Sequence, residues 1–136
     1  MKNLADRFLV KKAFTLVEIM LVVLVIALLA AIAIPNMLRA RQMAHESSAQ
    51  ATLKSIANAL ETYAASNSQY PLVTTSLIGV TPPYLSKDFF TGTHNGYVFA
   101  ASLTVATYNV TAIPASSGGG TTSYTISTGG LLVQNP

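Results

Sequence analysis

The sequence predicts an α+β fold in which one long helix, about residues 14–66, packs on a small antiparallel sheet, about residues 97–133. Residues 14–69 contain no glycine and only one proline, Pro35, and their second half repeats apolar side chains at helical spacing. From Tyr97 onward, aromatic and β-branched residues alternate with polar ones, as in strands with one buried face. A chain of 136 residues has room for one such domain.

The first part of the predicted helix is apolar on every side. From Phe14 to Ile34, only Thr15 and Glu18 are polar, and these 21 residues match the ~20 that a helix needs to cross a bilayer. Residues 1–13 carry a net charge of +3, and the remainder of the chain is neutral overall. A basic segment ahead of an apolar one stays on the cytoplasmic side of the membrane. No basic surplus remains on the folded part, so we expect no nucleic-acid binding.

Three interpretations of this N-terminal region stay open on pattern alone. It could be a plain signal anchor that is never cut, or a secretory signal peptide cut after the small-x-small sequence Ala31-Ile32-Ala33. It could also be a leader cut between Ala13 and Phe14. The secretory interpretation fits poorly, because residues 19–34 alone give 16 apolar residues, whereas the apolar region of a signal peptide spans about 7–15.

Pro35 should bend the helix rather than end it. Its ring removes one backbone hydrogen bond and disfavours helical geometry at Ile34, but the residues that follow favour helix. The second half of the helix carries an apolar stripe that should pack against the sheet, with Lys54, Asn58 and Glu61 lying away from it. The stripe consists of Ala49, Leu53, Ile56, Ala57, Leu60, Tyr63 and Ala64.

The remainder of the chain should form a connection and then the sheet. Residues 67–96 read as a long connection with a short helical turn near Leu77. Residues 97–101, 103–113 and 122–128 predict strands, and residues 131–133 predict a last short one. Residues 116–120, which include three consecutive glycines, predict a flexible turn between two strands.

The sequence offers no candidate for catalysis. His45 should lie on the polar side of the helix, beside Glu46, where it is better explained as a solvated residue. His94 should lie in the turn before Gly96 and is better explained as a turn residue. No acidic side chain follows Asp88, which leaves no general acid/base pair in the sheet region. Cysteine is absent. We therefore expect no enzymatic activity, no catalytic residues, no metal site and no cofactor.

Two segments closely resemble the N-terminus of type IV pilins and type II secretion pseudopilins. They are Lys-Lys-Ala-Phe-Thr-Leu-Val-Glu-Ile-Met-Leu-Val-Val at residues 11–23 and Ala-Ala-Ile-Ala-Ile-Pro-Asn at residues 30–36. The resemblance implies a pilin-like fold and a leader, residues 1–13 with Lys11 and Lys12 at its end, which a prepilin peptidase removes. Cleavage would fall between Ala13 and Phe14, and Phe14 would then be N-methylated. The family usually has glycine before the cut, so Ala13 is a departure that could slow cleavage.

The resemblance also gives Glu18 a role. A carboxylate within a membrane costs about 2.5–3.5 kcal/mol and usually has a partner, and the chain has no basic side chain between Phe14 and Arg39. Cleavage would create an amine at Phe14, four residues from Glu18 and on the same helical face. The family implies that Glu18 of an incoming subunit pairs with the Phe14 amine of its neighbour during assembly. The alternative is a carboxylate solvated at the membrane interface.

We therefore expect a structural subunit of a type IV filament. Residues 14–35 would anchor the precursor in the bacterial inner membrane by a single pass and later form the filament core. Residues 36–136 would form a periplasmic or cell-surface domain. The resemblance implies four partners: copies of the chain itself, the peptidase/methyltransferase, an inner-membrane platform protein and an assembly ATPase.

Two alternatives remain. One is a pseudopilin of a type II protein secretion system, which shares the same N-terminus. The other is a monomeric binding module, anchored or secreted, which would keep Met1 or begin at Ile34 and would be insensitive to changes at Glu18.

Overall fold

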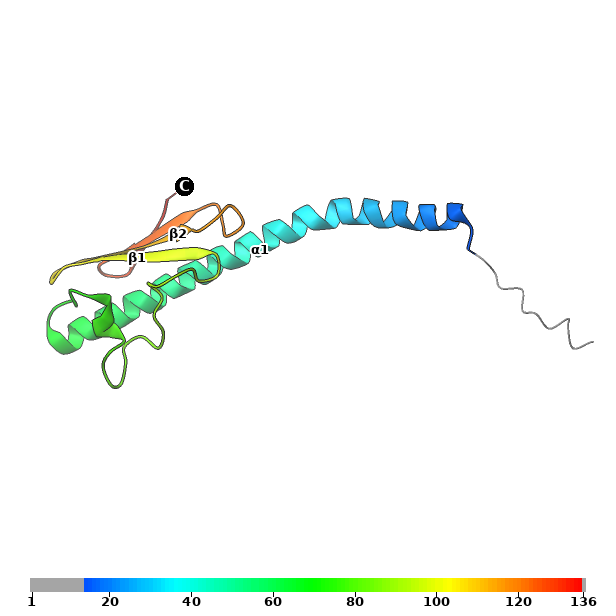
Figure 1. Cartoon of the computed structure of the whole chain (residues 1–136). Coiled ribbons are helices and arrows are strands. Elements are labelled where there is room, and N and C mark those ends of the chain that lie inside the picture. The colour runs from blue at the N-terminus through cyan, green and yellow to red at the C-terminus, as the bar shows by residue number, and fades with distance from the viewer. Residues whose placement is uncertain (1–13, 136) are drawn as a thin grey trace, which may run out of the picture. The chain divides into compact units, whose positions relative to one another are not determined.

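The computed structural model describes residues 14–135 and confirms the predicted α+β architecture (Figure 1). One long helix, α1, is followed by a turn of 3-10 helix, η2, and then by four strands. The helix begins within two residues of the predicted start and ends within one of the predicted end. The elements are α1 (Leu16–Asn67), η2 (Thr74–Leu77), β1 (Tyr97–Leu103), β2 (Tyr108–Pro114), β3 (Ser123–Ser127) and β4 (Leu131–Asn135).

The chain divides between Met37 and Leu38 into two compact units. The described part of the first unit is the beginning of α1, and the second unit holds the remainder of α1 together with the sheet. The second unit is the folded domain, and the first is considered below as the candidate site.

The sheet is a four-stranded antiparallel meander with the order β1-β2-β3-β4. The predicted strand over residues 103–113 is divided in the structure, because Leu103 ends β1 and Tyr108 begins β2. Thr104 and Thr107 close the turn between them without glycine or proline. The Thr107 amide donates to Thr104 Oγ1 at 2.9 Å, and the Thr104 amide donates to the Thr107 carbonyl at 2.9 Å. Side-chain hydroxyls can substitute for turn residues in this way.

The core lies between the second half of α1 and the inner face of the sheet. Alternate residues of β1, β2 and β3 face inward and meet the apolar stripe of the helix. Of the predicted stripe, five residues are buried, while Tyr63 and Ala64 are half-buried. Ala59 is also buried, although it was not among the residues predicted for the stripe. The buried residues of this hydrophobic core are Ala49, Leu53, Ile56, Ala57, Ala59, Leu60, Leu77, Leu85, Tyr97, Phe99, Tyr108, Val110, Ala112, Tyr124 and Ile126.

The connection between helix and sheet is anchored in the core by two leucines. Leu77 of η2 and Leu85 are buried in the core, and the Leu85 amide donates to the Leu77 carbonyl at 2.9 Å. Further along, Asp88 accepts hydrogen bonds from the Thr91 hydroxyl at 2.7 Å and from the Phe90 amide at 2.8 Å. These bonds hold the pKa of Asp88 below its ordinary value, so the carboxylate is ionised and closes the turn.

Residues 116–120 were predicted as a flexible turn because of their glycines. The structure shows a different reason for two of these glycines, which is close packing. Gly119 and Gly120 are buried. A Cβ on Gly119 would collide with the backbone of Gly96, and one on Gly120 would collide with the Tyr97 hydroxyl. Burial raises the pKa of Tyr97 to about 12, so its hydroxyl stays protonated and donates to the Thr122 carbonyl at 2.8 Å. The glycines therefore permit close packing on β1.

Glu61 was expected to lie away from the packed face of the helix, and this expectation was wrong. Its Oε2 accepts a hydrogen bond from the Tyr70 hydroxyl at 2.9 Å. Its Oε1 accepts from the Tyr108 hydroxyl at 3.0 Å and from the Gly129 amide at 3.1 Å. Burial, followed by the hydrogen bond to Glu61, raises the pKa of Tyr108 to about 12. One half-buried carboxylate thus ties α1 to β2, to the β3–β4 turn and to the segment that follows the helix.

We predict that Glu61→Ala lowers the unfolding free energy of the domain by about 2–4 kcal/mol. The substitution removes three hydrogen bonds to a charged acceptor and leaves the buried Tyr108 hydroxyl without its acceptor. Urea unfolding of the full chain in detergent, followed by near-ultraviolet circular dichroism, measures the change. Lys54→Ala, at an exposed position of the same helix, serves as the control and should change stability by less than about 0.5 kcal/mol. An equal loss in both variants would contradict this role of Glu61.

Candidate functional site

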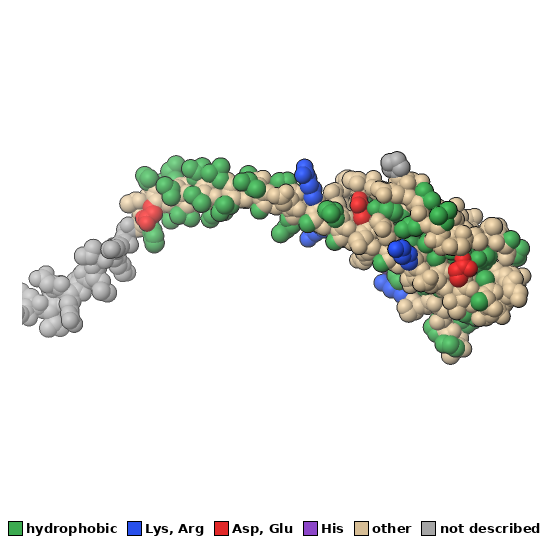
Figure 2. Space-filling view, turned by 180° about the vertical axis from the view of Figure 1, so that it is seen from behind, with side chains coloured by type: hydrophobic (Ala, Val, Ile, Leu, Met, Phe, Trp, Pro, Cys, Tyr) green, Lys and Arg blue, Asp and Glu red, His purple; other side chains and the backbone are tan. Residues whose placement is uncertain are grey.

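The described N-terminal part of α1 exposes an apolar surface that nothing in its own unit covers. Large hydrophobic side chains from Phe14, which is 76% exposed, to Ile34 stand out on all sides of the helix. Figure 2 shows these side chains along the visible face. The helix is long and apolar enough to cross a membrane, and no residue of its most apolar stretch is buried in the structure. Such a surface is stable only against lipid or against other protein.

The helix begins with a cap that the sequence contained but that was not predicted from it. Thr15 precedes the first helical residue, and its Oγ1 accepts a hydrogen bond from the Glu18 amide at 3.2 Å. The Thr15 carbonyl also accepts from the amides of Glu18, at 3.1 Å, and Ile19, at 3.3 Å. Thr-x-x-Glu is the pattern of a capping box, and half of that box is formed here. The cap fixes where the helix starts and therefore places Glu18 in its first turn.

Glu18 is exposed at this end of the helix, and its position there is electrostatically favourable. The first turn of a helix carries partial positive charge from unpaired amides, which favours a carboxylate by about 0.3–1 kcal/mol. The Glu18 carboxylate accepts no hydrogen bond from residues 14–135. Its capacity as an acceptor is therefore available to a group outside the described part of the chain.

Phe14 lies two residues ahead of the first helical residue, Leu16, and is exposed. It therefore lies at the same end of α1 as Glu18, which follows four residues later. The other predicted residues of this region, Lys11, Lys12 and Ala13, lie outside the described residues. Cleavage after Ala13 therefore stays a prediction.

Pro35 lies inside α1, which continues through it, as the sequence predicted. Proline has no amide to donate within the helix. Next to it, the side-chain amide of Asn36 donates to the Ile32 carbonyl at 3.1 Å, one turn earlier. This contact supports the backbone of the turn that contains Pro35. The bend itself stays a prediction.

Among residues 14–135, neither histidine forms a candidate active site with other titratable groups. His94 Nε2 lies 3.1 Å from the Thr91 carbonyl, and its ring packs edge-on against Phe89, with 5.5 Å between ring centroids. His45 is half-buried on α1. Its neighbour Glu46 is engaged elsewhere, since Glu46 Oε1 accepts from the Thr121 amide at 3.0 Å and hydroxyl at 3.2 Å. Within residues 14–135, no group of three His, Cys, Asp or Glu side chains is placed to hold a metal ion.

Comparison with known proteins found similar sequences. No family model matches the chain. It is similar to the type IV wide pilus major component PilA4 of Thermus thermophilus, with 33% identity over 94 residues that cover 66% of this chain and 72% of that protein.

The chain is also similar to two type II secretion proteins. Type II secretion system core protein G of Vibrio cholerae is 38% identical over 58 residues, which cover 43% of this chain and 40% of that protein. Core protein G of Escherichia coli is 34% identical over 61 residues, which cover 45% of this chain and 42% of that protein. The matches therefore span about two fifths of the length of these two proteins.

Proposed function

This chain belongs to the family of type IV pilins and type II secretion pseudopilins, and we propose that within it the chain is a structural subunit of a type IV filament. The observation that carries the proposal is the uncovered apolar helix from Phe14 to Ile34, attached to a domain whose own core is complete. Such a helix is covered by the bilayer before assembly and by the corresponding helices of neighbouring subunits after assembly.

The precursor resides in the bacterial inner membrane as a single-pass protein. Residues 14–35 cross the bilayer, the basic residues 1–13 remain on the cytoplasmic side, and the domain from residue 36 onward faces the periplasm. After assembly the domain lies on the outside of a periplasmic or cell-surface filament. No catalytic step by this chain is needed for that role.

Cleavage between Ala13 and Phe14 matures the subunit. A prepilin peptidase with methyltransferase activity makes the cut and methylates Phe14. The position suits a protease, because Phe14 is exposed and lies ahead of the helix, where the backbone carries no helical hydrogen bonds. The platform protein and the assembly ATPase then extract the mature subunit from the membrane.

Glu18 guides assembly by pairing with the new amine of Phe14 on a neighbouring subunit. Cleavage gives the filament one cation and one carboxylate per subunit in a region that is otherwise apolar. In such surroundings an unpaired charge is costly. Subunits whose position brings the Phe14 amine and the Glu18 carboxylate together are therefore favoured over subunits that leave either group unpaired. The pair sets the register, and burial of the apolar helices supplies most of the stabilisation.

A role as pseudopilin in a type II secretion system is the second candidate, and a specific observation favours it: two of the similar proteins are secretion-system core proteins. The membrane anchor, the cleavage and the role of Glu18 would be the same. Only the filament's location and purpose would differ.

We predict that the mature protein begins at Phe14. Mass spectrometry of the protein from membranes of cells that contain the peptidase should show loss of residues 1–13 and one added methyl group. Ala13→Gly should be processed faster, because glycine leaves more room beside the scissile bond. A mature protein that begins at Met1 or Ile34 would overturn the proposal in favour of an anchored or secreted module.

We predict that Glu18→Ala leaves cleavage intact but reduces filament assembly at least about tenfold, the effect expected if a desolvated ion pair worth more than ~1.4 kcal/mol is lost. Sedimentation of sheared filaments and immunoblotting quantify assembly. Glu18→Asp, which keeps the charge, is the matched control and should retain part of it. Normal assembly of Glu18→Ala subunits would refute the pairing.

Deletion of the gene distinguishes the two candidates. A pilus subunit should be required for surface filaments that antibodies against residues 38–135 label, while protein secretion stays normal. A pseudopilin should be required for release of secreted proteins, and such filaments should be absent from wild-type cells.

A further inference from the structure

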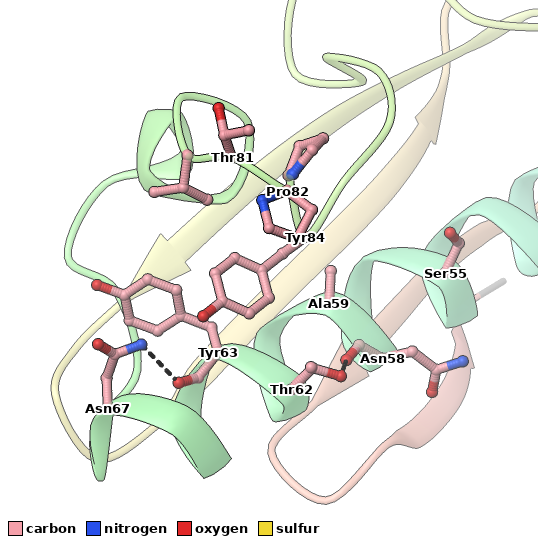
Figure 3. Close-up of a pocket in the computed structure, with 11 residues that line it drawn as sticks. Ser55, Asn58, Ala59, Thr62, Tyr63, Asn67, Thr81, Pro82 and Tyr84 are labelled. Carbon is pink, nitrogen blue, oxygen red and sulfur yellow. Dashed lines mark hydrogen bonds between the residues drawn. The ribbon is translucent and has the colours of Figure 1, made fainter.

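The domain contains a groove that the filament role does not use. It lies between α1 and the segment Val80–Tyr84, and has a volume of about 610 Å³. This is within the range of roughly 300–1,000 Å³ of small-molecule sites. We call it the tyrosine groove, after Tyr63 of the helix and Tyr84 of the opposite segment (Figure 3). Ala59, whose side chain is small, also lines the groove from the helix.

The tyrosine groove carries no charge. None of its lining residues is acidic, basic or histidine. A charged ligand would lose hydration there without gaining a counter-charge, so the groove suits a neutral ligand.

The polar groups of the groove are nevertheless numerous, and several are free. The hydroxyls of Tyr63, Tyr84 and Ser55 and the carboxamide of Asn58 make no hydrogen bond to any residue in 14–135. By contrast, the Asn67 amide is already used, since it donates to the Tyr63 carbonyl at 3.0 Å. The free hydroxyls and the carboxamide can each both donate and accept.

Aromatic surface completes the lining. The rings of Tyr63 and Tyr84 pack edge to face, with centroids 5.3 Å apart and planes inclined by 64°. This contact orients both rings and leaves them half-exposed at the groove. The face of an aromatic ring is electron-rich and attracts weakly polarised C–H groups.

We propose that the tyrosine groove binds a neutral saccharide. A sugar ring presents C–H groups on its faces and hydroxyls around its edge, so it can use the tyrosine rings and the free amide and hydroxyl groups together. A filament repeats the site in every subunit, so a weak site becomes effective on a surface that displays many copies of the sugar. Nothing in the proposal depends on the filament being a pilus.

Nuclear magnetic resonance on the full chain in lauryldimethylamine oxide micelles tests the proposal, because this detergent has no sugar headgroup. The probes are cellobiose, lactose and diacetylchitobiose. At least one should shift the signals of Asn58 and Tyr84 saturably, with a dissociation constant on the order of 1 mM. Tyr84→Phe and Asn58→Ala should each weaken binding about three- to tenfold, the effect of one lost hydrogen bond. Asn109→Ala, at an exposed position on β2, is the matched control and should change nothing.

Three results would overturn the proposal. They are the absence of saturable shifts with all three disaccharides, equal binding by the Asn58→Ala variant, and a groove that responds only to a decaproline peptide. The last would make it a peptide site, since aromatic grooves also accept polyproline segments. The Asn58→Ala subunits should still assemble, so failure of sugar binding and failure of filament formation are separate outcomes.

Discussion

The uncovered apolar surface of residues 14–34 is the constraint on which the remainder of the molecule depends. Burying apolar surface gains roughly 25 cal/mol per Å², so a helix that exposes large hydrophobic side chains on every side cannot remain in water. A monomer that folds in solution hides such a surface in its own core, but here the core is already filled by the second half of α1 and the sheet. The surface is therefore stable only where lipid or other protein covers it.

The same helix also makes the domain possible. Four short strands have one inner face to bury, and the stripe of α1 from Ala49 to Leu60 provides the second layer of the core. Glu46 and Glu61 reinforce this arrangement, because each carboxylate on the helix accepts hydrogen bonds from backbone or hydroxyl groups of the sheet region. The second half of α1 is thus an integral layer of the folded domain.

The fold could be predicted from the sequence because its main signals are periodic. Helical spacing and strand alternation each repeat over many residues, and the apolar run is long. Residues 14–69 also contain no glycine and only one proline. What the sequence did not give was set by single contacts between distant segments. Glu61 lies beside the stripe and bonds partners 9, 47 and 68 residues away. Gly119 is needed because the backbone of Gly96 approaches it. The Thr15 cap is an exception, since its Thr-x-x-Glu pattern is local and readable.

The carboxylates of the described chain supply a last argument about the site. There are four in residues 14–135, and three of them accept hydrogen bonds within the chain: Glu46, Glu61 and Asp88. Glu18 accepts nothing from these residues, although it occupies the most apolar surroundings of the four. A carboxylate in apolar surroundings is costly unless it has a donor, and Glu18 finds none within residues 14–135. This contrast with the other three carboxylates leaves Glu18 available to a donor outside the described residues, which is what the proposed pairing requires.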